Sequence, residues 1–281
     1  MTFSPELTFN DGNTIPQLGY GVWQVEDDVA EKVVFQAFQA GFRHIDTAKI
    51  YGNESGVGRA IASSGLSPEE IFITTKLWNA DQGYESTLAA FEESLERLGL
   101  ETLDLYLIHW LQPKQDKYVD TWKALIELQK RGKVKSIGVS NFTVEGLQRI
   151  IDETGVVPAI NQVELHPYFS QSELRKFNAS QGILTQAWSP LGQGGELLAD
   201  PVIAGIAQKH GATAAQVVIA WHLAIGNVVI PKSVTESRIR ENFDALNVTL
   251  DAGDVEAING LDRTADGTGR IGPDPAVSDF A

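Results

Sequence analysis

The strongest constraint on the fold is a regular alternation between short apolar segments and longer segments of helical period. The short segments are rich in branched residues, which favours strands. They cover residues 18–22, 43–47, 71–76, 103–109, 135–140, 159–163, 183–188 and 227–231. Most of them start roughly 23 to 32 residues apart, about the length of one strand followed by one helix.

The segments between these strands carry the helical period. An apolar stripe from Val29 to Ala37 is followed by Gly41, and a second stripe from Leu88 to Leu98 is followed by Gly99. Glycine is the usual residue just after a helix, so both helices have predicted ends. Further helices are predicted around residues 144–151, 201–210 and 213–225.

Eight strands that alternate with helices predict an α/β fold, a closed parallel (β/α)8 TIM barrel, in one domain over residues 1–281. The alternative is a doubly wound open sheet, which predicts a glycine-rich turn after its first strand. The segment that starts at Gly19 offers G-x-G but has Gln24 at the place of the third glycine. The barrel is therefore favoured. A turn at Asp11-Gly12 predicts an N-terminal β-hairpin, placed at the bottom of the barrel.

Composition narrows the class of protein. Hydrophobic residues make up 43% of the 281 residues and charged residues 21%, as in ordinary globular proteins. The net charge of −15 would repel a phosphate polymer, so no nucleic-acid partner is expected. The absence of cysteine excludes disulfides and thiolate metal sites. With no signal sequence and no apolar run of membrane-spanning length, we expect a cytoplasmic monomer with no membrane partner.

Almost every predicted strand ends in a polar or ionisable residue. Each one alone has a structural explanation, because such side chains often bind loop backbone or solvent. In a barrel, however, the carboxyl ends of all strands meet at one face, where active sites lie. The residues concerned are Asp46, Lys76, His109, Ser140, Asn141, Gln162, Trp188, Ser189, Lys232 and Ser233.

Four of the polar residues near this face can form an acid–base group. Asp46 and Lys76 end neighbouring strands, and a buried pair would satisfy both charges. Tyr51 follows in the loop above, and an adjacent ammonium is expected to lower its pKa from about 10. With His109 on the next strand, the group could supply a proton to a carbonyl oxygen that gains negative charge.

A carbonyl reduction also needs an electron donor. No metal site is expected, because the five histidines are scattered and cysteine is absent. A hydride donor remains: Trp188 could stack on a flat ring, and Ser140, Asn141 and Gln162 could bind a carboxamide. The segment 231–242 adds Lys232, Arg238 and Arg240 at the start of a predicted helix, a combination suited to phosphate.

With these residues the chain resembles a known family, the aldo-keto reductases, over essentially its whole length. It is most similar to the prokaryotic 2,5-diketo-D-gluconate reductase type. The motifs that carry the resemblance are GFRHIDTAKIYGNE, ITTKLW, DLYLIHW, IGVSNF, NQVELHP, WSPLGQG and IPKSVTESRIREN, in the order the family has them.

The resemblance implies an NADPH-dependent enzyme that reduces aldehydes or ketones, with dicarbonyls or keto-sugars as candidate substrates. It places the catalytic tetrad at Asp46, Tyr51, Lys76 and His109, with Tyr51 as the proton donor. Cofactor contacts fall on Gly21, Val22, Asp46, Ser140, Asn141, Gln162, Trp188, Ser189, Leu191, Lys232, Ser233, Val234, Arg238, Glu241 and Asn242. Substrate contacts fall on Trp23, Tyr51, Trp78, His109 and Trp110.

Two departures from the family pattern concern the substrate. Leu111 follows Trp110 where a proline is common, and the tail from Gly269 to Ala281 is short, which predicts an open pocket. Two other functions share the same residues. Lys76 could form a Schiff base in a lyase, or the chain could bind a nucleotide without catalysis. A serine hydrolase is disfavoured, because the segment around Ser140 lacks the nucleophile-elbow pattern.

Overall fold

The computed structural model describes residues 4–280, and its centre is a parallel sheet of eight strands. The strands lie side by side in chain order from β3 to β10. They are β3 (Tyr20–Gly21), β4 (His44–Asp46), β5 (Phe72–Leu77), β6 (Leu103–Ile108), β7 (Val134–Ser140), β8 (Ile160–Glu164), β9 (Leu184–Trp188) and β10 (Val228–Val229).

The first and last strands meet and close the barrel. Leu18 and Val229 form a parallel bridge. The backbone N–H of Gly19 donates to the carbonyl of Val229 at 2.9 Å, and the N–H of Val229 donates to the carbonyl of Gln17 at 2.8 Å. A closed parallel barrel was predicted, and the open-sheet alternative is wrong.

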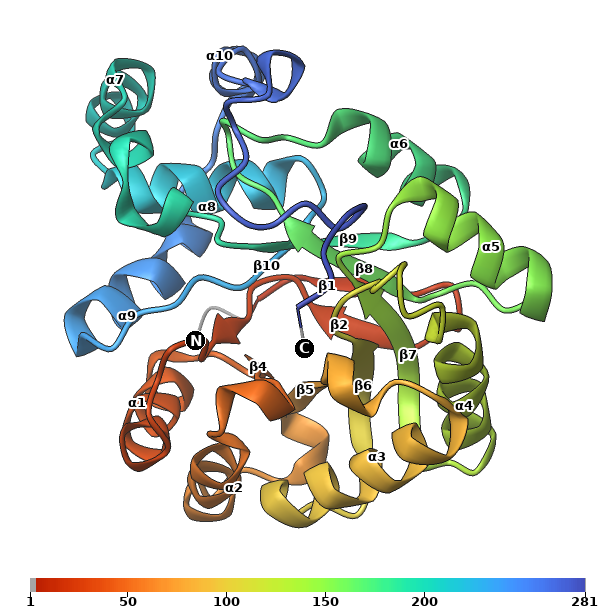
Figure 1. The fold of residues 1–281 in the computed structure, drawn as a ribbon. Helices are drawn as coiled ribbons and strands as arrows, with labels where there is room; N and C mark the ends of the chain where they lie inside the picture. The colour runs from red at the N-terminus through yellow and green to blue at the C-terminus, as the bar shows by residue number, and fades with distance from the viewer. Residues whose placement is uncertain (1–3, 281) are drawn as a thin grey trace.

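Helices form a ring outside the strands (Figure 1). They are α1 (Asp27–Ala40), α2 (Glu54–Ser63), α3 (Tyr84–Leu98), α4 (Tyr118–Lys130), α5 (Val144–Thr154), α6 (Ser172–Ser180), α7 (Pro201–His210), α8 (Ala214–Ala224), α9 (Glu236–Phe243) and α10 (Ala252–Asn259). The predicted helix ends are confirmed, since α1 and α3 stop at Gly41 and Gly99, both with positive φ. Neither glycine meets the steric penalty that a side chain would bring.

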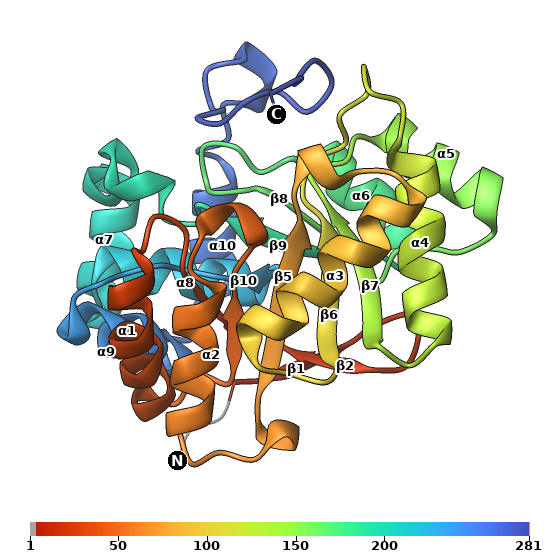
Figure 2. The same ribbon diagram turned by 60° about the horizontal axis from the view of Figure 1, so that its bottom comes forward.

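A two-stranded hairpin covers the bottom of the barrel, as predicted (Figure 2). Its antiparallel strands are β1 (Glu6–Thr8) and β2 (Thr14–Pro16). Phe9 and Ile15 pack against side chains at the starts of the barrel strands, among them Phe72 and Ile160. Asn13 adds hydrogen bonds to Lys135 O and Ser136 Oγ, at 3.2 and 3.1 Å. The hairpin therefore seals the end of the barrel that lies opposite the strands' carboxyl ends.

Side chains along each strand alternate between the barrel interior and the helices. Ile45, Ile73 and Tyr106 face outward and pack into the main core beneath the helices. Asp46, one position after Ile45, and Lys76, three positions after Ile73, face inward. The period of two in the strands therefore delivers both charged side chains to the inside of the barrel.

Candidate active site at the carboxyl end of the barrel

A buried ion pair lies at the centre of the candidate site. Lys76 Nζ of β5 is 2.5 Å from Asp46 Oδ1 of β4, and the two side chains are 0% and 2% exposed. The ammonium also donates to the carbonyl of Thr47 at 2.8 Å, and the amide of Gln162 donates to Asp46 Oδ2 at 2.7 Å. Additional hydrogen bonds of this kind offset the cost of burying two charges.

Tyr51 ends a short 3-10 helix, η1 (Lys49–Tyr51), in the loop after β4. Its ring centroid is 5.1 Å from Lys76 Nζ. Asn53 fixes the loop: its Oδ1 accepts from Thr47 Oγ1 at 2.7 Å, and its Nδ2 donates to the carbonyls of Val22 and Val25 at 2.9 and 2.8 Å. The loop that carries Tyr51 is therefore bound to the two strand ends beside it.

Burial and charge set the protonation of these groups. Burial alone would lower the pKa of Lys76, but Asp46 and Tyr51 more than offset this effect and raise it, so the ammonium persists at neutral pH. For Tyr51, burial raises the pKa above 10.0, and Lys76 opposes this rise without cancelling it. The predicted lowering of the Tyr51 pKa is therefore wrong, because desolvation exceeds the attraction of the neighbouring ammonium. The phenol keeps its proton at neutral pH.

His109 lies on the other side of Tyr51, at the end of β6. The two rings meet edge to face with centroids 5.7 Å apart. Burial, and then the charge of Lys76, holds the pKa of His109 well below 6.5. A neutral imidazole can donate or accept one hydrogen bond beside the phenol.

Four polar strand ends form one connected network next to the ion pair. Trp188 Nε1 donates to Asn141 Oδ1 at 2.8 Å, and Asn141 Nδ2 donates to the carbonyl of His109 and to Ser140 Oγ, both at 3.0 Å. Ser140 Oγ donates to the carbonyl of Gln162 at 2.8 Å. The network holds the Trp188 ring in one orientation at the rim. It also brings together all the residues predicted to hold a carboxamide and a flat ring.

The other predicted cofactor residues lie around the same rim. Gly21 and Val22 continue β3, and the N–H of Val22 donates to the carbonyl of Asp46 at 3.1 Å. Ser189 follows Trp188 directly and has a φ of 49°, and Leu191 comes two residues later. The first of these segments therefore lies beside Asp46.

The basic segment after β10 suits a phosphate group. Lys232 and Arg238 are exposed, and among residues 4–280 neither forms an ion pair, whereas Arg240 pairs with Glu236 at 3.0 Å. No side chain caps the N-terminus of α9. Free backbone N–H groups and two unpaired cations fit an anionic ligand, even on a chain of net charge −15.

The remaining residues of this segment position it. Ser233 accepts from Tyr20 through its carbonyl. Glu241 accepts from Thr213 Oγ1 at 2.7 Å, which links α9 to α8. Asn242 is buried, and Val234 is half exposed.

The three predicted substrate tryptophans follow β3, β5 and β6. Trp78 stacks edge to face on His109 with centroids 5.3 Å apart, and Trp110 lies 6.5 Å from Trp188. Trp23 is 44% exposed in the loop after β3. Trp78 and Trp110 therefore surround the catalytic candidates, and Trp23 remains at the outer edge.

Two residues at this face were missed in the sequence. Glu164 is buried at the end of β8, and Phe280 lies against Trp110 with centroids 4.9 Å apart. An acidic strand end was the same signal that identified Asp46, and Phe280 is the only aromatic residue of the tail. The prediction of an open pocket is wrong on this side, because the tail reaches the tryptophans. Residue 281 lies outside the described residues.

Lys49 is the lysine nearest to Tyr51 in sequence and points away from the ion pair. Its Nζ is 2.9 Å from Asp81 Oδ2 and 3.2 Å from Glu93 Oε2. These two carboxylates hold it in its loop. It remains separate from Asp46.

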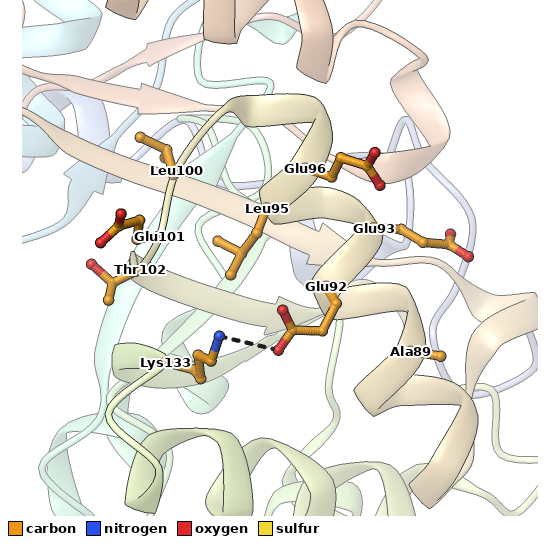
Figure 3. A pocket seen from close by; sticks show the side chains of 9 residues that line it. All are labelled: Ala89, Glu92, Glu93, Leu95, Glu96, Leu100, Glu101, Thr102 and Lys133. Carbon is orange, nitrogen blue, oxygen red and sulfur yellow. Dashed lines mark ion pairs between the residues drawn. The ribbon is translucent and has the colours of Figure 1, made fainter.

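Other features of the molecule do not add to the site. A hollow of about 710 Å³ lies on the outer surface beside α3, and Figure 3 shows its glutamates with the Glu92–Lys133 ion pair of 3.5 Å. None of the residues that line it is among the candidate site residues. Within residues 4–280, no group of three or more His, Asp or Glu side chains could hold a metal ion. No helix of this part of the chain is both long and apolar enough to cross a membrane.

Comparison with known proteins places this geometry in context. The model of the aldo/keto reductase family matches residues 16–263. A Mycolicibacterium smegmatis protein described as an aldo-keto reductase is 56% identical over 277 residues, 99% of each chain. A Salmonella typhimurium protein named methylglyoxal reductase DkgA is 52% identical over 270 residues, 96% of each chain.

Solved structures agree with the sequence relatives. The apo crystal structure of Gox0644 matches with a TM-score of 0.95 and 52% identity, covering 99% of this chain and all of that one. A variant of Gox0644 was solved in complex with NADPH, and it matches with a TM-score of 0.94 and 51% identity over 99% of this chain.

Proposed function

The chain belongs to the aldo/keto reductase family, and from this premise we propose that it reduces aldehydes and ketones with Tyr51 as the proton donor. It is an oxidoreductase that uses NADPH to reduce carbonyl compounds. The proposal therefore concerns which residues act and which carbonyl compounds are accepted.

One observation carries the assignment of Tyr51. Its ring is close to both the buried Asp46–Lys76 pair and the neutral His109, with its centroid 5.1 Å from Lys76 Nζ and 5.7 Å from the centroid of the imidazole. A phenol with a raised pKa is protonated at neutral pH and becomes acidic enough only when a strong base appears beside it. A carbonyl oxygen that gains negative charge is such a base.

The other members then have distinct tasks. His109 offers a neutral ring nitrogen that can hold the carbonyl oxygen near the phenol. The Lys76 ammonium stabilises the phenolate that remains after proton transfer, and Asp46 holds the ammonium in place. NADPH, when bound, supplies the hydride that the carbonyl carbon receives.

The residues around the rim fit that cofactor. The fixed face of Trp188 suits the nicotinamide ring, and Ser140, Asn141 and Gln162 lie beside it. Lys232 and Arg238 are free to pair with the 2′-phosphate that distinguishes NADPH from NADH.

A Schiff-base lyase is disfavoured by the same geometry. Lys76 donates to both Asp46 and the carbonyl of Thr47, and its raised pKa keeps it protonated. A protonated amine has no lone pair for attack on a carbonyl carbon.

We propose small dicarbonyls such as methylglyoxal as the first substrates to test, with keto-sugars second. Relatives named methylglyoxal reductase are about half identical to this chain over nearly its full length. The aromatic side chains of Trp78, Trp110 and Phe280 enclose the mouth and favour compact carbonyl compounds.

The finer expectations about the molecule in the cell are also proposals. We propose that one domain over residues 1–281 acts as a monomer in the cytoplasm, without a nucleic-acid partner. The net charge of −15 supports the last point. Light scattering coupled to size-exclusion chromatography would contradict the monomer if the measured mass were a multiple of 30.6 kDa.

The replacement Tyr51→Phe tests the function. Proton transfer by a positioned side chain is worth roughly a hundredfold or more, so kcat should fall at least that far. NADPH binding, followed by quenching of tryptophan fluorescence, should stay within about twofold. Tyr84→Phe is the matched control, because Tyr84 is 37% exposed on α3. A Tyr51→Phe enzyme that keeps the wild-type rate would show that another group donates the proton.

A further inference from the structure

The C-terminal segment crosses the face of the barrel that carries the candidate site. Figure 2 shows it above the strand ends, opposite the hairpin. We call residues 269–280 the C-terminal strap. It holds no helix or strand, so its position depends on contacts with the rest of the molecule. These contacts gather at its two ends.

The first end is held by a buried carboxylate. Glu164 is 1% exposed at the end of β8. Its Oε1 accepts from the backbone N–H of Ile271 at 2.6 Å, and its Oε2 accepts from the N–H of Gly272 at 2.7 Å. Arg270, just before them, lies over the ring of Phe169 at 4.6 Å. Hydrogen bonds to a charged acceptor are roughly twice as strong as neutral ones.

This end also supports the cofactor side of the site. A Cβ atom on Gly272 would lie 2.5 Å from Cη2 of Trp188, so the strap backbone packs directly on the indole. Nε1 of the same indole donates to Asn141 Oδ1 at 2.8 Å. The strap and Asn141 thus hold the Trp188 ring at two points.

The second end lies on the substrate side. Two amide side chains hold the carbonyl of Phe280: Asn79 Nδ2 at 2.9 Å and Gln112 Nε2 at 3.1 Å. The Phe280 ring contacts Trp110 and Trp78, with centroids 4.9 and 6.1 Å away. Asp279 and Lys114 form an ion pair of 2.5 Å at the surface.

We propose that Glu164 is a positioning residue: it anchors the C-terminal strap so that one segment fixes both Trp188 on the cofactor side and Phe280 on the substrate side. This inference rests on the proposed function for its meaning in catalysis. Within residues 4–280, no hydrogen bond or ion pair joins Glu164 to the four catalytic candidates; besides the strap, its Oε1 lies 3.1 Å from His166 Nε2.

The physical reason lies in the choice of acceptor. A carboxylate offers an acceptor oxygen to each of two successive N–H groups, which no neutral side chain of the same size does. An amide at this position would turn one of its N–H groups toward a backbone N–H. The strap would then lose one hydrogen bond and gain a repulsive contact. Release at this end frees the chain that leads to Phe280.

Glu164→Gln is the central test, with two readouts. In hydrogen–deuterium exchange, the amides of Ile271 and Gly272 should exchange about tenfold faster or more. In steady-state kinetics with a small dicarbonyl, KM should rise about tenfold while kcat stays within roughly threefold. A purely structural role would lower the melting temperature without this separation of KM from kcat.

Phe280→Ala examines the other end of the strap. It should raise KM for the same substrate to a similar extent. If one strap carries both effects, the double variant should raise KM little further than either single variant. KM effects that multiply in the double variant, or fast exchange with unchanged KM, would overturn the proposal.

Two matched variants serve as controls. Glu173→Gln changes a glutamate on α6 that is 84% exposed and, among residues 4–280, forms an ion pair with Lys176 alone. Val277→Ala changes an exposed position of the strap itself. Both should leave exchange and KM at wild-type values. The exchange experiment needs no turnover, so it still tests the strap if no carbonyl is reduced, an outcome that would count against the proposed function alone.

Discussion

The two ends of the barrel differ in whether residues other than glycine take positive φ. At the bottom, each connection that leads into β4–β10 holds a glycine at positive φ. These glycines are Gly41, Gly65, Gly99, Gly132, Gly155, Gly182 and Gly226. At the mouth, Gly52, Gly83, Gly192 and Gly194 have positive φ as well, but non-glycine residues also take this backbone conformation there. They are Gln24, Gln112, Asp116, Asn141, Gln171, Ser189 and Gln193, and within residues 4–280 no other non-glycine residue has positive φ.

The difference shows what each end is built for. Glycine adopts positive φ without steric cost, whereas a side chain there costs free energy. At the mouth, several of these side chains have a task. Asn141 links His109 to Trp188, Gln112 holds Phe280, and Gln171 donates to the carbonyl of Glu164 at 2.6 Å. Backbone strain at the mouth is therefore coupled to the positioning of side chains, whereas glycine keeps the turns at the bottom free of strain.

The side chains inside the barrel also differ between the two ends. Near the bottom it is filled by apolar side chains such as Ile15, Phe72 and Leu105. Near the mouth it holds the Asp46–Lys76 pair at 2.5 Å. Replacements at the mouth should therefore affect catalysis and stability together, and replacements at the bottom should affect stability alone.

The largest effect is expected for Lys76→Met at the mouth. It leaves Asp46 buried without its partner, which should lower the free energy of unfolding by about 3–5 kcal/mol. The rate should also fall at least about a hundredfold, because the phenolate loses its nearby charge. Urea denaturation and NADPH consumption measure the two effects.

A double variant separates the two contributions. Asp46→Asn together with Lys76→Met removes both charges, so much of the stability should return while the rate stays low. A double variant that regained activity would contradict the proposal that the charge of Lys76 supports proton donation by Tyr51.

An intermediate effect is expected at the bottom, for Ile15→Ala in the hairpin. Ile15 is fully buried, and such truncations cost about 2–5 kcal/mol. The measurement is again urea denaturation, with kcat and KM recorded below the transition. Thr8→Ala, at an exposed hairpin position, is the control. A change in KM for Ile15→Ala would mean that the two ends are coupled.

The smallest effect is expected from exchanging the turn residues of the two ends. Gly155 has a φ of 72° and open space around a Cβ, so Gly155→Gln should cost about 1 kcal/mol from backbone strain alone. Gln24→Gly, at φ 56°, removes that strain but adds freedom to the unfolded chain, so its net effect should stay within roughly 0.5 kcal/mol. Equal costs at both positions would contradict the contrast between bottom and mouth.

The sequence predicted the framework and the central pair for a physical reason. Strand and helix periods are local, and a parallel barrel brings all strand ends to one face, so Asp46 and Lys76 had to be neighbours. Features that depend on packing were not predicted. The pKa of Tyr51 rises because the effect of burial exceeds that of Lys76. The extent of burial depends on the packed structure and cannot be derived from the local motif.

The strap was missed for a similar reason. Its anchors join Glu164 to Ile271 and Asn79 to Phe280, positions far apart in sequence and without a shared period. The sequence also did not predict that Asn141 and Gln112 have positive φ and hold neighbouring groups, because local propensity favours glycine in this conformation.

The closure of the barrel between Leu18 and Val229 has a consequence for folding on the ribosome. Gln17 and Asn227, which are 210 positions apart, are joined by a hydrogen bond of 3.0 Å at this seam. One edge of the first barrel strand therefore stays unpaired until nearly the whole chain has been synthesised. Long-range pairing of this kind is slow, and an open strand edge invites pairing with other chains. Protection of this edge during synthesis is thus a condition for the yield of active protein.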